Sequence, residues 1–282
     1  MPTLKSLTLY PIKSCGGIAL QEAEVTQHGL AHHGIRDREW MVVDPEGNLL
    51  TQREYPVMAL IVPQVAGEVL EVRAPGAALT LPISSTSLDH APTLDVRVWD
   101  DFVQAWDCGS EAAAWFTGVL GTPCRLVRFH AQGKRLASAK WTGERAVPTL
   151  FADGFPMLVV SEASLEDLNQ KLLAQGREAL PMNRFRPNVV IDGIEAFEED
   201  YAATIQIGAA CLQPVKPCAR CPMPSVDQAT GSFGPDPLDI LQSYRANPLV
   251  DGGITFGMNA ILLEGEHTLL RVGMEATVEL AF

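Results

Sequence analysis

Residues Val215 to Gly231 read Val-Lys-Pro-Cys-Ala-Arg-Cys-Pro-Met-Pro-Ser-Val-Asp-Gln-Ala-Thr-Gly, and the rest of the chain is organised around them. Two thiols, Cys218 and Cys221, lie on either side of Arg220. A positive charge fixed beside a thiol favours the thiolate, which is the form that binds soft metals. Proline fixes φ and has no N–H, so this stretch is predicted to be a stiff loop, neither a helix nor a central strand; its prolines are Pro217, Pro222 and Pro224.

The Cys-x-x-Cys spacing suits more than one kind of site. A structural zinc or iron–sulfur centre needs four ligands, usually in two pairs, whereas the other cysteines stand singly. A thioredoxin-like dithiol would open a helix, and Pro222 with Pro224 disfavours that. Two thiols in an ordinary loop are the remaining alternative. The spacing alone leaves these alternatives open; the single cysteines are Cys15, Cys108, Cys124 and Cys211.

Composition limits the classes of partner. The 282 residues are enough for one large domain or two modest ones. A net charge of −13 argues against binding to nucleic acid or to an anionic membrane surface. The few lysines and arginines therefore become informative wherever they gather. Six cysteines, no signal-peptide pattern and no apolar run of about 18 residues predict a reduced, cytoplasmic protein that does not associate with membranes.

Hydrophobic patterning predicts a mainly β protein with some helix, of the α+β class. Short apolar runs divided by glycine, proline and asparagine predict a small antiparallel barrel in the first half of the chain. Its expected strands are Leu49–Thr51, Val57–Val62, Val69–Val72, Leu79–Pro82, Val96–Trp99 and Val103–Trp106. Separate strands are expected at Leu4–Tyr10 and Arg125–Phe129. We expect a first unit over residues 1–130, a connecting segment over 131–148 and a second unit over 149–282.

Helical spacing appears in three places. Ser110 is the expected N-cap of a helix that ends at Gly121. A second helix follows the strand Met157–Val160; Leu165, Leu168, Leu172 and Leu173 are expected to share its buried face. Later elements predicted from the pattern are the strand Val189–Asp192, a helix over Pro237–Ala246 and a closing strand over Val278–Phe282.

The stretch Val215 to Gly231, called the signature stretch below, resembles the cysteine loop of the MOSC family. The resemblance is stronger to the branch that includes the mitochondrial amidoxime-reducing components. Other matching motifs are spread along the chain: Tyr-Pro-Ile-Lys-Ser-Cys-Gly-Gly at 10–17, Arg-Asp-Arg at 36–38, Thr-Gln-Arg at 51–53, Asn-Arg-Phe-Arg-Pro-Asn at 183–188 and Phe-Gly-Met-Asn at 256–259. The resemblance implies a MOSC N-terminal β-barrel-like unit packed on a MOSC β-barrel domain, with loops of the first unit contributing to a shared cofactor site.

The resemblance also implies roles for individual residues. The second cysteine of Cys-x-Arg-Cys ligates molybdenum in that branch, so Cys221 is the implied metal ligand and catalytic residue. Lys13 and Ser14 match positions at the phosphate end of the pterin cofactor, and Arg186 and Asn188 match its main contacts. The other implied cofactor contacts are Arg38, Arg53, Arg184, Ala219, Arg220 and Asn259.

What the resemblance implies is a molybdenum-cofactor-dependent oxidoreductase that reduces N-hydroxylated substrates such as amidoximes, hydroxylamines and N-hydroxylated bases. The implied cofactor is molybdenum–molybdopterin (Mo-MPT), with no role for pyridoxal phosphate. Electrons would come from a separate donor protein that carries a flavin, a ferredoxin-like cluster or a cytochrome b5-like haem. Two alternatives stay open: Cys221 could carry sulfur as a persulfide, or the protein could bind and deliver the cofactor.

Overall fold

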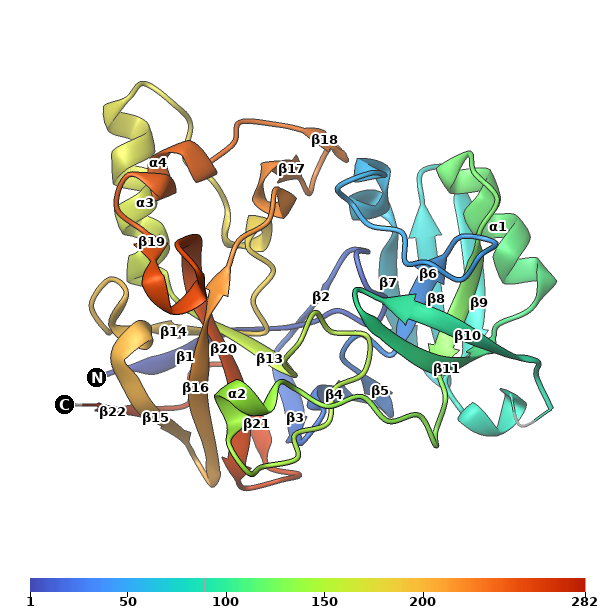
Figure 1. The fold of residues 1–282 in the computed structure, drawn as a ribbon, viewed down its shortest axis with the longest axis horizontal. Coiled ribbons are helices and arrows are strands. Elements are labelled where there is room, and N and C mark those ends of the chain that lie inside the picture. Colours follow the sequence, from blue (N-terminus) through green and yellow to red (C-terminus); the bar gives the residue numbers. More distant parts are fainter. Residues whose placement is uncertain (89, 282) are drawn as a thin grey trace.

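The protein is mainly β, with a few short helices between the strands. The structure is a computed structural model that describes residues 1–88 and 90–281. Figure 1 shows two lobes, one carrying α3 (Glu162–Ala174) and α4 (Leu238–Gln242), the other carrying α1 (Ser110–Leu120). The expected fold class, including the two-unit barrel architecture, is confirmed.

The first lobe is built on a nine-stranded sheet. Strands β13 (Met157–Ser161) and β14 (Val189–Asp192) are parallel neighbours connected through α3, and the other described pairs in the sheet are antiparallel. A parallel pair needs such a crossover. The order is β2 (Ile18–Leu20), β1 (Thr3–Leu9), β14, β13, β20 (Gly253–Glu264), β16 (Ala210–Ala219), β15 (Ala202–Ile207), β22 (Ala276–Leu280), with β19 (Ala246–Asn247) beside β20.

Smaller antiparallel sheets form the second lobe and its junction with the first. One sheet has the order β10 (Thr93–Val98), β11 (Asp101–Asp107), β12 (Arg125–Phe129), β6 (Trp40–Val43). A second has the order β7 (Val62–Ala66), β8 (Val69–Ala74), β9 (Ala77–Pro82). A third contains β21 (Leu269–Arg271), β3 (Glu22–Thr26), β4 (Gly29–His32) and β5 (Ile35–Arg36), and β17 (Val226–Asp227) pairs with β18 (Ser232–Phe233).

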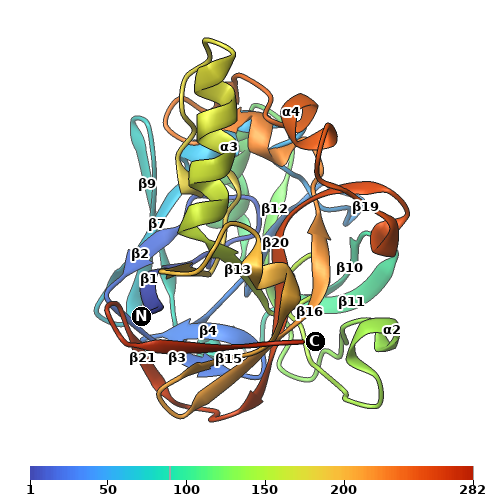
Figure 2. The same cartoon turned by 90° about the vertical axis from the view of Figure 1, so that its left-hand side faces the viewer.

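Strand pairing crosses the division expected from the sequence in two places. The first strand, β1, belongs to the first unit but pairs with β14 of the second unit, in the nine-stranded sheet. In Figures 1 and 2, β1 is the dark blue strand of that sheet. Near the other end of the chain, β21 pairs with β3. The two units therefore share hydrogen-bonded sheets, and loops that follow β1 are held against the second half of the chain. The residue limits of the units stay a prediction.

The prediction that the whole stretch from Val215 is a loop is wrong for its first residues. Strand β16 continues to Ala219 and lies between β20 and β15 inside the sheet. Proline is tolerated inside a sheet where a bulge removes the need for its N–H. The register with β20 shifts between Pro214 and Lys216 and again between Pro217 and Ala219. The bulges re-aim the strand end, and Cys221 follows two residues later.

Two expected strands in the first half are also wrong. Leu49 makes only an isolated bridge with Val43, and residues Pro56–Leu60 form a 3₁₀ turn, after which β7 starts at Val62. A proline in the first turn favours that helical start. The closing strand is β22, two residues earlier than expected, and the expected end at Phe282 lies outside the described residues.

The helices form where the leucine and alanine spacing predicts them, with differences at their ends. The N-cap of α1 is Gly109 and not Ser110, and Gly121 ends that helix in the left-handed region. In α3 the Ser161 hydroxyl accepts a hydrogen bond from the Ser164 N–H, which caps the first turn. The expected helix over Pro237–Ala246 is shortened to α4.

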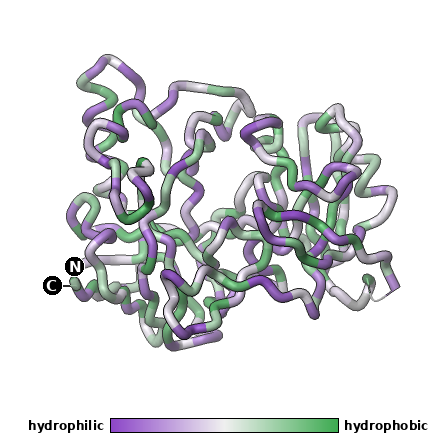
Figure 3. The backbone as a smooth tube through the Cα atoms, in the orientation of Figure 1, coloured by the Kyte–Doolittle hydropathy of each residue, from purple (hydrophilic) through white to green (hydrophobic). Residues whose placement is uncertain are grey.

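The buried face of α3 is narrower than the sequence analysis expected. Leu165, Leu168 and Leu172 are buried, but Leu173 is 59% exposed, so its placement on the core face is wrong. Residue 173 lies about 100° around the helix from residue 172, which carries it off the apolar stripe. In Figure 3 the turn beyond the end of α3 is hydrophilic, whereas the sheet beneath is largely hydrophobic.

The connecting segment contains one helical turn, α2 (Ala139–Thr142). The segment is anchored to the rest of the protein, because Arg135 and Ala137 are buried and the Ala137 N–H donates to the Val147 carbonyl at 2.9 Å. Among the described residues no helix has the length and apolar character needed to cross a membrane.

A matched pair of substitutions in α3 tests the packing. Leu168→Ala removes a fully buried side chain and should lower the free energy of unfolding by about 2–5 kcal/mol. Leu173→Ala is the same change on the exposed face and should stay within about 0.5 kcal/mol of the parent. Urea unfolding of both variants measures the difference, and equal losses would contradict the register of α3.

Candidate functional site

A cavity of about 220 Å³ lies between residues from the two halves of the chain. Its walls come from the loop after β1, the β10–β11 hairpin, the loops before β13 and β14, and the end of β16. All predicted site residues except Arg184 line it: Lys13, Ser14, Arg38, Arg53, Arg186, Asn188, Ala219, Arg220, Cys221 and Asn259. The structure thus gathers residues that are up to about 250 positions apart in the sequence.

Arg184 lies outside this cavity. Its guanidinium donates to the Pro224 carbonyl at 3.1 Å and pairs with the Asp227 carboxylate at 3.1 Å, and only 3% of its side chain is exposed. These contacts hold the segment after Cys221 against the turn that precedes β14. The contacts are those of a residue that shapes the loop, and none of them reaches the cavity.

Asn188 joins the two halves directly. Its amide N–H₂ donates to Asp37 Oδ1 at 2.9 Å and to the Thr8 carbonyl at 3.1 Å, while its oxygen accepts from Arg38 Nη1 at 3.0 Å and from the Leu158 N–H at 3.1 Å. All these bonds are made by a side chain that is 1% exposed. Such a buried, saturated amide fixes its neighbours because any misplacement leaves a donor or acceptor unpaired.

Two guanidinium groups enclose the ring of Tyr10. The Arg38 carbon Cζ lies 4.4 Å from the ring centre and that of Arg186 lies 4.2 Å from it. Both arginines have positive φ, 49° and 56°, in the left-handed region that non-glycine residues rarely adopt. Strained backbone at a cavity wall indicates a position held for its side chain. The Tyr10 ring therefore contacts both cations.

The two arginines differ in their counter-ions. Arg38 pairs with the buried carboxylate of Asp37. Arg186 is 7% exposed, has no carboxylate partner among the described residues, and makes one long hydrogen bond, 3.4 Å to Gln228 Oε1. Burial lowers the pKa of Arg186, and the like charge of Arg38 lowers it further. A buried, uncompensated cation is costly, so the cavity wall is suited to an anion.

Lys13 is held at the other side of the cavity. Its ammonium donates to the Phe151 carbonyl at 2.8 Å and to Asp153 Oδ1 at 2.6 Å, and the Trp99 indole N–H donates to the same oxygen at 3.1 Å. Burial lowers the pKa of Lys13, an effect that the Asp153 carboxylate opposes. The Asp153 side chain is largely exposed, and the Lys13 ammonium holds its pKa well below its usual range.

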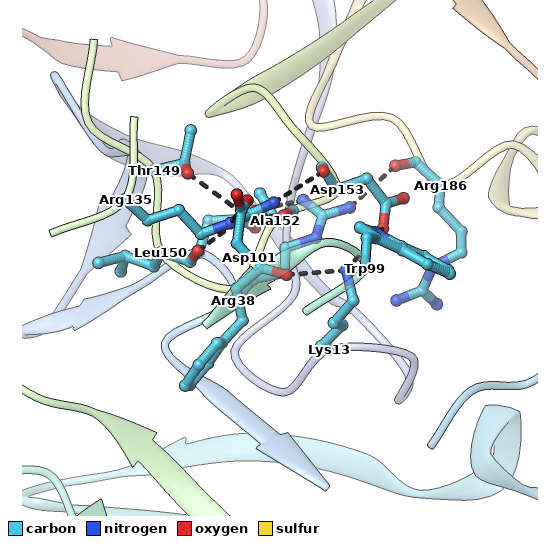
Figure 4. Close-up of polar contacts among 12 residues, drawn as sticks. Lys13, Arg38, Trp99, Asp101, Arg135, Thr149, Leu150, Ala152, Asp153 and Arg186 are labelled. Atoms are coloured by element: carbon cyan, nitrogen blue, oxygen red, sulfur yellow. Dashed lines mark hydrogen bonds and ion pairs between the residues drawn. The ribbon is translucent and has the colours of Figure 1, made fainter. Parts of the chain in front are cut away.

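A buried arginine fixes the loop that carries Asp153. Arg135 donates to the carbonyls of Leu150, Ala152 and Asp153, and its Nε donates to Asp101 at 2.6 Å (Figure 4). Asp101 starts β11, so one side chain of the connecting segment links the hairpin to the loop at the cavity wall. Main-chain carbonyls bound in this way leave the loop little freedom.

The two cysteines of the signature stretch are placed differently although both line the cavity. Cys218 Sγ accepts a hydrogen bond from Arg220 Nη1 at 3.2 Å and packs against the cluster around Phe185 and Phe256. Cys221 is half-buried and has no hydrogen-bond partner among the described residues. The Cys221 sulfur is therefore the one left free for a ligand.

Further cavity residues were not chosen in the sequence analysis. Lys216, Trp99 and Asp153 contribute polar groups, and Phe155 and Met157 contribute apolar surface. Lys216 stands in the signature stretch itself, between Pro214 and Pro217, and a second cation close to Arg220 was an available signal. Trp99 depends on the turn of the β10–β11 hairpin, where its φ is 57°, and no local motif indicates that this turn meets the cavity.

The residues fit an anionic, metal-bearing organic cofactor better than a bare metal ion. Among the described residues no group of three or more histidine, cysteine, aspartate or glutamate side chains could hold a metal, so further ligands must come from outside the protein. Buried Arg220 Nε and Thr51 Oγ1 lack hydrogen-bond partners within the described part of the chain. The cations that line the cavity are Lys13, Arg38, Arg53, Arg186, Lys216 and Arg220.

Comparison with known proteins identifies the family of this chain. Residues 1–123 match the MOSC N-terminal beta barrel domain and residues 147–277 match the MOSC domain. Mitochondrial amidoxime reducing component 2 of Bos taurus is 38% identical over 248 residues, covering 86% of this chain and 72% of that protein. Mitochondrial amidoxime-reducing component 1 of Mus musculus is 38% identical, with 86% and 71% covered.

A more distant relative carries the same region inside a longer protein. The molybdenum cofactor sulfurase of Danio rerio is 32% identical over 96% of this chain, which corresponds to 34% of that protein. The matched domains, the shared coverage and the geometry of the cavity lead to one conclusion. This chain belongs to the MOSC family, with a MOSC N-terminal β-barrel domain followed by a MOSC domain.

Proposed function

We propose that the protein is a molybdenum-cofactor-dependent reductase of N-hydroxylated compounds, in the cytoplasm, supplied with electrons by a separate donor. The observation that carries this proposal is the buried, uncompensated guanidinium of Arg186 in the same cavity as the free thiol of Cys221. The relatives named as amidoxime-reducing components support the choice of substrate class. Amidoximes, hydroxylamines and N-hydroxylated bases share the N–O bond that would be broken.

The chain's cations would bind the anionic end of Mo-MPT. Arg186 offers a planar pair of N–H donors to phosphate oxygens, and Lys13 offers a compact charge. Asn188 and Asp37 hold Arg38 in place, so the positive wall exists before the cofactor arrives. A preformed site avoids the cost of ordering these side chains on binding.

Cys221 would hold the metal as a thiolate. The neighbouring Arg220 guanidinium donates its hydrogen bond to Cys218 and not to Cys221. When bound, the cofactor supplies two-electron chemistry at the metal. The overall change balances as N–OH plus two electrons and two protons giving N–H and water. Phe155, Met157 and Leu158 line the cavity with apolar surface that limits access of bulk water to the site.

A second candidate is a sulfur-carrying role for Cys221. Its half-buried sulfur has no hydrogen-bond partner among the described residues, and such a sulfur could also carry a persulfide. One relative is named as a molybdenum cofactor sulfurase. Binding and delivery of the cofactor would use the same cavity. Metal content and activity distinguish these roles from catalysis.

Cofactor content is the first test. Protein purified from a host that makes the molybdenum cofactor should carry about one molybdenum atom per chain, together with a pterin that fluoresces after oxidation. Elemental analysis and fluorescence of the acid extract measure both. Protein that carries neither, from a host shown to load another molybdoenzyme, would favour the sulfur carrier.

Arg186→Ala should affect the loaded and the empty protein in opposite ways. A charge-assisted phosphate contact is worth roughly 1.5–3 kcal/mol, so cofactor retention during dialysis should weaken about ten- to a hundredfold. The cofactor-free variant should be no less stable than the cofactor-free parent, because it loses an uncompensated buried charge. Arg73→Ala, which removes a side chain that is 63% exposed, is the control. Unchanged retention, or unfolding of the empty variant, would contradict the assignment.

The two cysteines give a paired test. Cys221→Ser should keep the pterin through its phosphate contacts but lose reductase activity by orders of magnitude, since serine stays protonated where cysteine ionises. Cys218→Ser should retain most activity. Molybdenum X-ray absorption should count one metal–sulfur bond fewer in Cys221→Ser alone. If Cys218→Ser is the inactive variant, the ligand assignment is wrong.

A further inference from the structure

We propose that the connecting segment around α2 is the docking surface for an acidic electron-carrier protein. We call this the α2 surface, defined by Lys134, Leu136, Lys140 and Arg145. The inference rests on the proposed reductase function, which requires that electrons reach the cavity from a separate protein. It adds the place where that donor binds and the sign of the donor's charge.

The α2 surface reverses the charge balance of the chain. The whole sequence has 34 acidic and 21 basic residues, yet the exposed charged residues of 131–145 are three basic ones and one acidic one, Glu144; the remaining basic residue, Arg135, is buried and paired with Asp101. Lys134, Lys140 and Arg145 are exposed and make no ion pair with any described residue. A local excess of positive charge on a protein whose net charge is negative orients an approaching charged partner.

The surface is connected to the cavity through a single aromatic ring. The ammonium of exposed Lys140 lies 5.2 Å from the centre of Trp141, and the ammonium of cavity residue Lys216 lies 5.7 Å from it. Lys216 also lies 5.8 Å from the ring of Phe155, another cavity residue. A partner seated over α2 would therefore be separated from the cavity by Trp141 and its neighbours, which keeps the electron path short.

The surface is also rigid and partly apolar. Trp141 packs with buried Ala137, Val147 and Phe155 in one cluster, which fixes α2 against the sheet. Leu136 is 58% exposed and follows the buried Arg135 that is bound to Asp101. Figure 2 shows α2 and the β10–β11 hairpin on the same side of the molecule.

This combination suits a transient electron-transfer contact. Such interfaces are small, below about 1,200 Å², and depend on charge complementarity more than on buried area. An acidic donor would be repelled by the net charge of −13 at long range. At about 0.1 M salt the Debye length is about 10 Å, so the nearby lysines and arginine decide the orientation. A basic donor would meet the wrong charge at this surface.

The test compares two triple charge reversals in the loaded enzyme. Lys134→Glu, Lys140→Glu and Arg145→Glu reverse the α2 surface, and Lys5→Glu, Arg73→Glu and Arg271→Glu make the same change in net charge on exposed positions elsewhere. Reduction of benzamidoxime is measured at about 0.1 M salt with an acidic plant-type [2Fe–2S] ferredoxin, with the soluble domain of cytochrome b5, and with reduced methyl viologen. Molybdenum content is measured for each protein.

The α2 variant should lose about tenfold or more in kcat/KM for a protein donor that serves the parent, and should keep its methyl viologen activity and molybdenum content. The control variant should keep most of its activity with the protein donor. Equal losses in the two variants, or no loss in the α2 variant, would overturn the docking surface. A parent inactive with methyl viologen would instead overturn the reductase function, and with it the docking proposal.

Discussion

The hydrogen bonds of Asn188 to Asp37 and Arg38 are the constraint on which the rest of the site depends. They join a loop from the second half of the chain to a loop from the first, in an environment that excludes water. Strand β1 of the first unit pairs with β14 of the second unit and so brings those loops together. The hydrogen bonds of the Asn188 amide then fix the distance between the two loops. The cavity thus belongs to neither unit alone.

Given that junction, electrostatics explains what the cavity can hold. Six lysines and arginines of this acidic chain line the cavity, and the carboxylates of Asp37 and Asp153 are ion-paired with Arg38 and Lys13. Arg186 is left without a carboxylate partner in the described part of the chain, and burying such a charge costs stability unless an anion joins it. Binding of an anionic cofactor would offset that cost, which links loading of the site to stability of the fold.

The sequence predicted the fold class and most strands, and ten of the eleven site residues chosen from motifs line the cavity. It failed where a residue's place depends on distant partners. Pro217 reads as a loop residue, yet bulges against β20 keep it inside a sheet. Arg184 and Arg186 were both expected at the cofactor, and only the packing shows that Arg184 pairs with Asp227 instead. Trp99 reaches the cavity through a hairpin from the other unit, and Leu173 shows that apolar character does not decide burial at a helix edge.

The most direct test of the central claim is a crystal structure of the protein purified from a host that makes the molybdenum cofactor, with anomalous data at the molybdenum edge. The account predicts one molybdenum peak at Cys221 Sγ and a pterin phosphate within hydrogen-bond distance of the Arg186 guanidinium. A molybdenum peak at Cys218, or a cofactor whose phosphate lies away from Arg186, would contradict it.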